Sequence, residues 1–188
     1  MSVIAPEAAP EIVALAAAGR LRHLARSYRA GDLAGALLAY VSTDDPETIR
    51  SLVAEAARER VLLNVIDTPE ACTFVSPAVV ERGELQVAVG TGGASPGLAA
   101  QLRREIEAQL GPEYGPFVAI LGAVRRTLGA DPMRAGERAR VVATLLASPL
   151  LDLVRHRRRD EIDALLAGVA GSGYTLERLG VALDGRAA

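Results

Sequence analysis

The stretch Val61-Leu62-Leu63-Asn64-Val65-Ile66-Asp67 decides the fold, because it places an acidic residue directly after an apolar run. Such a run is typical of a strand that is covered on both faces of a sheet. Ala36 to Val41 has the same character, and Thr43 to Glu47 begins a predicted helix between the two runs with capping residues, a proline and an acid. Strand, helix and strand in this order predict a parallel, doubly wound sheet.

Two more strands are predicted upstream of this unit. Ser2 to Ala5 is a short apolar run, and Arg20 to Arg26 alternates polar and apolar residues as a half-exposed edge strand does. Pro6 and Glu7 suit the first turn of a helix between them, and Gly19 ends that helix.

Downstream, the pattern changes to a hairpin and then to helices. Residues 74–80 and 85–89 are strand-like and are joined by a turn that contains Gly83. Helices are predicted at roughly 96–110, 113–128, 134–147 and 149–168, where glycine and proline residues mark the breaks. The last ~15 residues are rich in glycine, and we expect them to be frayed.

Composition excludes several classes of function. The 188 residues include 21 basic residues, all arginine, against 23 acidic residues, and this balance predicts no nucleic-acid partner. Cys72 is the single cysteine, which fits a reducing, cytoplasmic compartment. The chain shows no signal-peptide pattern and no apolar run near the ~20 residues that span a bilayer, so no membrane association is expected. His23 and His156 lack metal-ligand spacing, and no metal site is predicted.

Asp67 is the first candidate for chemistry, because ligands of a doubly wound sheet bind beyond the carboxyl ends of its strands. Its apolar neighbours Val65 and Ile66 would favour the neutral carboxyl group and prepare it for proton transfer near neutral pH. The alternative is a simple turn or cap at the end of a strand, which Asp67-Thr68-Pro69 also fits.

The second candidate is the turn Thr91-Gly92-Gly93-Ala94-Ser95-Pro96. Ser95 suits the capping position and Pro96 the first position of a helix, and the free amides of such a turn bind carboxylates or phosphates. Arg103 and Arg104 follow about two turns later and can add positive charge. An ordinary, well-capped connection from strand to helix is the alternative.

Three further residues lie where a dinucleotide would bind. Glu7 follows a predicted strand, and an acid at such a position holds the adenosine ribose in dinucleotide-binding folds, although a dipole-favourable position in the first turn of a helix also explains it. Thr43 and Asp44 follow another strand beside the expected cofactor cleft, and helix capping alone also explains them.

The basic cluster of residues 155–159 is interpreted as a solvated helix face.

Taken in order, these segments resemble the precorrin-2 dehydrogenase/sirohydrochlorin ferrochelatase family, which also forms the N-terminal half of siroheme synthase. The resemblance covers nearly the whole chain. Its segments are Val3 to Glu7, Ser42 to Glu47, Asn64 to Asp67, Phe74 to Pro77, Thr91 to Pro96, and, in the helical tail, Glu137-Arg138 and Ser148-Pro149-Leu150.

The resemblance implies an NAD-dependent oxidation of precorrin-2 to sirohydrochlorin in siroheme biosynthesis, with ferrous iron as a second substrate in some members. It assigns the catalytic role to Asp67 and cofactor contacts to Pro6 and Glu7, beside which we add Thr43 and Asp44. Thr91 takes the place of a serine found in some members. Since precorrin-2 carries many carboxylates, we expect Thr91, Gly92, Gly93 and Ser95 to bind the substrate.

The implied fold is α/β, with a truncated Rossmann-like parallel sheet in a partial NAD-binding domain over residues 1–70. A hairpin and a helix over 71–112 form a region for homodimerisation and substrate binding, and a helical C-terminal region follows over 113–188.

The chain departs from the family pattern in two places. Ile49 stands where the family usually has asparagine, and the strand, Gly-rich turn and helix that open the family are absent, with no G-x-G-x-x-G in the sequence. In strand order 3-2-1-4-5 the first strand is central, so the strands at 2–5 and 36–41 should each lack a neighbour. We therefore expect the true start to lie upstream of Met1, or the chain to be a fragment.

The alternative functions are a truncated, non-catalytic relic or dimerising module that does not bind NAD, and an unrelated small α/β ligand-binding domain.

Overall fold

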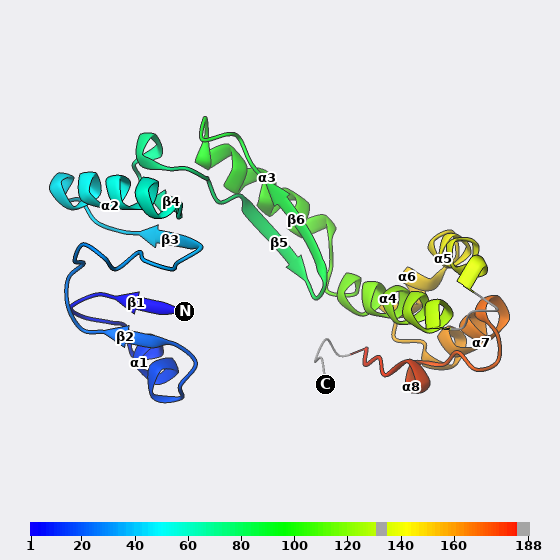
Figure 1. Cartoon of the computed structure of the whole chain (residues 1–188). Helices are drawn as coiled ribbons and strands as arrows, with labels where there is room; N and C mark the ends of the chain where they lie inside the picture. Colours follow the sequence, from blue (N-terminus) through cyan, green and yellow to red (C-terminus); the bar gives the residue numbers. More distant parts are fainter. Residues whose placement is uncertain (131–134, 184–188) are drawn as a thin grey trace. The chain divides into compact units, whose positions relative to one another are not determined.

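The computed structural model describes residues 1–130 and 135–183, which belong to two compact units, Met1–Ser76 and Pro77–Ala188. The first unit contains β1 (Ser2–Ile4), α1 (Pro10–Ala17), β2 (Arg22–Leu24), β3 (Leu38–Val41), α2 (Pro46–Glu59), β4 (Leu62–Val65) and a 3₁₀ turn (Pro69–Ala71) (Figure 1). The second contains β5 (Ala78–Arg82), β6 (Leu85–Val89), α3 (Pro96–Gln109), α4 (Tyr114–Ala130), a 3₁₀ turn (Ala135–Glu137), α5 (Arg138–Leu146), α6 (Leu150–Arg155), α7 (Arg159–Ala170) and α8 (Leu176–Leu179).

The predicted parallel strands are confirmed, and they form two separate pairs. β1 pairs with β2, with Val3 opposite His23, and β3 pairs with β4, with Ala39 opposite Leu63. Within the described residues no strand pairs with both β1 and β3. The interruption expected at this place in the sheet is therefore observed, and it leaves one edge of each pair without a neighbouring strand.

Helix α2 covers one face of the β3–β4 pair. Leu52 and Ala56 of the helix pack with Leu63 and Val65 of β4 in one buried cluster. Asp45 caps the helix by accepting a hydrogen bond from the Thr48 amide at 2.9 Å, as the capping pattern predicts. The helix ends at Glu59, and the following residue, Arg60, has a left-handed φ of 58° and turns the chain into β4.

The start of α1 differs from the prediction. The helix begins at Pro10 rather than at Pro6, and residues 5–9 form an irregular connection after β1. Ala9 is extended, with φ −59° and ψ 151°, because a residue that precedes proline is sterically disfavoured in the helical region. Pro10 therefore sets the first position at which this helix can begin.

In the second unit, β5 and β6 form the predicted antiparallel hairpin, with Arg82 opposite Leu85. Gly83 in its turn has a φ of +61°, and a Cβ atom there would lie 3.4 Å from the Cα of Gly115. Glycine is thus favoured at position 83 by the left-handed backbone conformation, and the first turn of α4 lies in contact with this turn.

The helical bundle that follows has a continuous core. Its buried side chains come from α4 to α8 and include Ile120, Val124, Leu145, Leu150 and Leu166. Among the described residues no helix is both long and apolar enough to cross a membrane.

Two helical predictions downstream are corrected. The helix expected over 149–168 is two helices, α6 and α7, separated at residues 156–158, where Arg157 has a left-handed φ of 54°. The break lets Leu153 before it and Ile162 after it face the same core. Residues 174–183 are also more ordered than predicted, because Leu176 is buried and its amide donates to Asp163 at 2.7 Å, and the rest of that predicted segment lies outside the described residues. The helix predicted to begin at residue 134 starts outside the described residues; its described part is the 3₁₀ turn and α5.

Candidate functional site

Asp67 lies at the carboxyl end of β4, where the sequence places it. β3 and β4 are parallel and end side by side, with Val41 opposite Val65 and the Ile66 amide donating to the Val41 carbonyl at 2.9 Å. Asp67 has a φ of 59°, which is uncommon for a residue other than glycine and is most readily tolerated by Asn and Asp. A non-glycine residue held in this conformation at the end of a strand is a candidate for function.

The surroundings of Asp67 differ from the expectation. The residue is exposed rather than enclosed by its apolar neighbours, and Ile66 beside it is 50% exposed. In the described part of the chain, the Asp67 carboxylate makes no hydrogen bond or ion pair with another residue. Both carboxylate oxygens are therefore open to an incoming molecule, but the apolar desolvation inferred from the sequence is absent in this structure.

The turn after β3 lies at the same sheet edge as Asp67. The Thr43 hydroxyl accepts from the Asp45 amide at 3.3 Å, and Asp45 accepts from the Thr48 hydroxyl at 2.6 Å. These bonds with Thr48 hold the pKa of Asp45 below its ordinary value. Asp44 is exposed between these capping residues. The structure thus brings Thr43, Asp44 and Asp67 to the edge formed by the carboxyl ends of β3 and β4. The residue that caps α2 is Asp45.

Pro6 and Glu7 lie beyond the carboxyl end of β1, and both are exposed. Since α1 begins only at Pro10, Glu7 is not in the first turn of a helix. The structural alternative for Glu7, that its charge faces the positive end of the helix dipole from within the first turn, is therefore wrong. The connection around it is fixed from the neighbouring strand, where His23 Nε2 lies 3.0 Å from the Ala5 carbonyl oxygen.

The glycine turn belongs to the second unit, between β6 and α3. Gly92 and Gly93 have φ values of +61° and +85°, and no atom lies within 4 Å of a Cβ built on either residue. Ser95 caps α3 by accepting from the Leu98 amide at 3.3 Å, and the Thr91 hydroxyl accepts from the Ser95 amide at 3.1 Å. Within the described residues, neither glycine amide donates to a protein acceptor, so both are available to an anion.

Arg103, one of the two arginines expected to assist this turn, has another role in the structure. Arg103 forms an ion pair with Glu107 one turn farther along α3, and Arg82 of β5 joins them at 3.4 Å from Glu107. These interactions, with Arg103 the stronger partner, keep the pKa of Glu107 below its ordinary value. Arg103 therefore supports the contact between α3 and the hairpin rather than the glycine turn.

Sequence reasoning missed Glu55, whose side chain is buried on α2 with the residue 2% exposed. Its carboxylate accepts from the amides of Gly31 at 3.0 Å and Leu33 at 2.8 Å and from the Tyr28 hydroxyl. Burial raises the pKa of Tyr28, which with the Glu55 bond reaches about 12, so Tyr28 stays a donor. These bonds fix the connection from β2 to β3, and only the fold brings the partners together.

The basic cluster of residues 155–159 is partly structural. Arg155 donates to Glu113 from Nε and Nη2, both at 3.0 Å, and this ties the end of α6 to the start of α4. Arg158 pairs with Glu161 at 2.5 Å at the start of α7, and the cluster spans the connection between α6 and α7, so it is not the single helix face that the sequence predicts. Among the described residues, no group of three or more His, Cys, Asp or Glu side chains is placed to hold a metal ion.

Two family models match separate parts of the chain. Residues 1–78 match a family model described as putative NAD(P)-binding, and residues 82–109 match one described as sirohaem biosynthesis protein central. The siroheme synthase of Chromobacterium violaceum is 38% identical over 154 residues, which are 82% of this chain and 33% of that protein. The siroheme synthase of Methylococcus capsulatus is 31% identical over 178 residues, or 95% of this chain and 38% of that protein.

The chain thus spans about a third of the length of these curated relatives. A solved structure described as SirC, precorrin-2 dehydrogenase, superposes with a TM-score of 0.66 at 21% identity, over 87% of this chain and 81% of that chain. This likeness establishes a shared fold, and it confirms the Rossmann-like α/β class. The chain therefore belongs to the precorrin-2 dehydrogenase/sirohydrochlorin ferrochelatase family, of which the N-terminal part of siroheme synthase is also a member.

Proposed function

We propose that this chain acts in siroheme biosynthesis and oxidises precorrin-2 to sirohydrochlorin with NAD as the electron acceptor. The observation that carries the proposal is the position of Asp67, exposed and left-handed at the end of β4, inside the segment that matches the NAD(P)-binding model. Family membership supports the pathway, and the chemistry of Asp67 supports the reaction.

In this proposal Asp67 is the general base. Oxidation of a carbon–nitrogen or carbon–carbon single bond removes a proton as well as a hydride, and a carboxylate within hydrogen-bond reach takes that proton. Asp67 has both oxygens open, and its backbone is held by the Ile66 bond to β3. Its contribution is therefore positioning and proton transfer at the carboxylate oxygen.

The exposed residues at the strand ends of the first unit fit the ribose of a dinucleotide better than its pyrophosphate. Glu7, exposed beyond β1 and next to Pro6, is available to accept hydrogen bonds from ribose hydroxyls. Thr43 and Asp44 offer further polar groups at the edge where Asp67 lies. For the pyrophosphate, however, the described residues include no Gly-rich turn between a parallel strand and its helix, and NAD is proposed on the basis of family membership.

For the substrate, the proposal assigns carboxylate binding to the turn after β6. The free amides of Gly92 and Gly93 and the hydroxyl of Thr91 can donate to a carboxylate, and the positive end of α3 favours its charge. Ser95 caps α3 and so positions this turn. In the proposal its hydroxyl group also donates a hydrogen bond to the substrate.

Three further assignments belong to the same proposal. Ferrous iron is a second substrate, inserted into sirohydrochlorin with Asp67 again accepting protons. The hairpin region carries a homodimer contact, since the two-stranded β5–β6 sheet has α3 on one face and presents Val79 at 36% exposure. The third assignment is that the protein acts in the cytoplasm.

The proposal is tested by incubating the chain with precorrin-2 and NAD and following the absorbance of sirohydrochlorin. Turnover that depends on NAD is the expected result. No sirohydrochlorin above a control without protein would contradict the dehydrogenase assignment.

A non-catalytic dimerising module is the second candidate, and the separation of β1–β2 from β3–β4 favours it. A dinucleotide needs a continuous sheet edge, which two separate pairs do not provide. Calorimetric titration with NAD distinguishes the two candidates, because binding in the micromolar range excludes the non-catalytic reading.

A further inference from the structure

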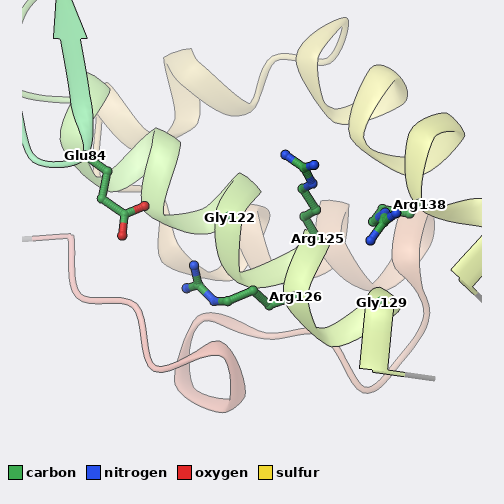
Figure 2. Close-up of a pocket in the computed structure, with 6 residues that line it drawn as sticks. All are labelled: Glu84, Gly122, Arg125, Arg126, Gly129 and Arg138. Carbon is green, nitrogen blue, oxygen red and sulfur yellow. The ribbon is translucent and has the colours of Figure 1, made fainter.

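A pocket in the second unit lies outside the residues assigned so far. It is a hollow of about 530 Å³ lined by residues of three elements. Glu84 comes from the hairpin turn, Arg138 is the first residue of α5, and the rest lie on α4: Gly122, Arg125, Arg126 and Gly129. Figure 2 shows Glu84 and Arg126 facing each other beside Gly122, with Arg125 farther to the right on α4 and Arg138 on α5.

Glycines on α4 make room for the guanidinium groups. A Cβ atom at Gly122 would lie 3.3 Å from Arg126 Nη1 and 3.6 Å from Glu84 Oε2. A Cβ atom at Gly129 would lie 3.0 Å from Arg138 Nη1, closer than such contacts normally come. Because residues 122, 126 and 129 share one face of the helix, two missing side chains open the surface beside two arginines.

The charges of this pocket are unbalanced. Elsewhere in the unit, Arg82 and Arg103 pair with Glu107, Arg155 pairs with Glu113, and Arg158 pairs with Glu161. In the described residues, by contrast, Arg125, Arg126 and Arg138 form no ion pair. Three guanidinium groups therefore line one hollow with a single carboxylate, that of Glu84, and the excess positive charge favours an anion.

The pocket is separate from the glycine turn at Thr91. Glu84 lies at the start of β6 and Thr91 beyond its end, and this strand has five residues. At about 3.3 Å per residue, this strand alone separates the two sites by about 16 Å along the hairpin. A single carboxylate or phosphate group bound at one site therefore does not reach the other.

We propose that this pocket is a second anion site that binds a ligand with two or more oxyanion groups. Each guanidinium presents a planar fork that matches a carboxylate or a phosphate, and several forks around one hollow favour a multivalent ligand over a single ion. The oxyanions are either carboxylates of a tetrapyrrole, in which case the inference rests on the proposed function, or phosphates of a free phosphate compound.

Protection of arginines from chemical modification tests this proposal on the unmodified chain. Phenylglyoxal is applied with and without uroporphyrin III, a tetrapyrrole with many carboxylates, or inorganic pyrophosphate, and mass spectrometry follows each arginine. At ten times the Kd, modification of Arg125, Arg126 and Arg138 should slow about tenfold, because about one site in eleven remains empty. Arg159, exposed at the start of α7, should react at an unchanged rate.

The two probes identify the source of the oxyanion. Protection by uroporphyrin III and not by pyrophosphate supports a tetrapyrrole ligand, and protection by pyrophosphate supports a phosphate compound. Equal modification rates with and without either probe would overturn the proposal. Because this readout needs no turnover, a failed dehydrogenase assay leaves its result intact.

A variant pair provides the second measurement. Arg126→Gln with Arg138→Gln should raise the Kd for the protecting probe by about tenfold or more and should reduce the salt dependence of binding. Arg159→Gln removes the same kind of charge elsewhere and should leave the Kd unchanged. An equal loss of affinity in Arg159→Gln would show a general charge effect and contradict the assigned site.

Discussion

The buried carboxylate of Glu55 provides a prediction whose size follows from the structure. Glu55→Gln keeps an acceptor oxygen for the amides of Gly31 and Leu33, now without its charge. Charge-assisted hydrogen bonds are about twice as strong as neutral ones, so each of these bonds should weaken by about 1 kcal/mol. The connection from β2 to β3 should therefore open more easily by about 2 kcal/mol, or about 30-fold.

Hydrogen exchange followed by mass spectrometry measures this opening. Peptides that cover residues 25–37 should exchange about 30-fold faster in Glu55→Gln, while peptides from α4 stay unchanged. Glu59→Gln is the matched control, since Glu59 lies on the same helix but is exposed and, among the described residues, pairs with its neighbour Arg58 alone. An increase below about threefold in Glu55→Gln, or an equal increase in the control, would refute the reasoning.

The same group predicts a pH dependence. Burial alone would raise the pKa of Glu55, but the hydrogen bonds from Tyr28, Leu33 and Gly31 outweigh it and bring the pKa below its ordinary 4.5. A carboxylate with a depressed pKa stabilises the fold above its unfolded pKa and loses that effect as the pH falls through the folded value. Protection of residues 25–37, corrected for intrinsic exchange, should thus decline below pH 4.5 in the wild type and not in Glu55→Gln.

Three other predictions concern local stability. The hydrogen bond from Arg26 lowers the pKa of Asp32 to about 2, against the opposing effect of burial. The ion pair between Arg26 and Asp32 is therefore fully formed above pH 3.8, the ordinary pKa of this carboxyl group, and should be lost only as the pH falls toward 2. NMR titration of the Asp32 carboxylate measures this loss. Ser95→Ala removes the cap of α3 and should destabilise the second unit by about 1 kcal/mol in urea unfolding. Leu145→Ala, in the bundle core, should destabilise it by about 2–5 kcal/mol in the same assay, and a loss below 1 kcal/mol would contradict the packing described.

The elements predicted well from the sequence are those whose causes are local. β3, α2 and β4 follow from two apolar runs and from the cap at Asp45, and the hairpin follows from alternation around Gly83. The position of Asp67 at a strand end could be predicted in the same way. The glycine turn can be recognised in the sequence because Ser95 and Pro96 mark the start of a helix.

What the sequence did not reveal depends on distant contacts. Glu55 and its partners are 22 to 27 residues apart, and nothing near Glu55 indicates a buried carboxylate. The break at Arg157 has no glycine or proline, and it exists because α6 and α7 share one core. The exposure of Asp67 could not be predicted either, since an apolar neighbour in sequence does not have to cover a side chain in space.

The most direct test of the account is turnover of precorrin-2 by Asp67→Asn. Asparagine has the same shape and tolerates the left-handed backbone, so circular dichroism should match the wild type. Because general-base catalysis contributes about 100-fold or more, formation of sirohydrochlorin with NAD should fall at least about 100-fold. An Asp67→Asn variant that forms sirohydrochlorin at the wild-type rate would remove Asp67 from the mechanism and contradict the central claim.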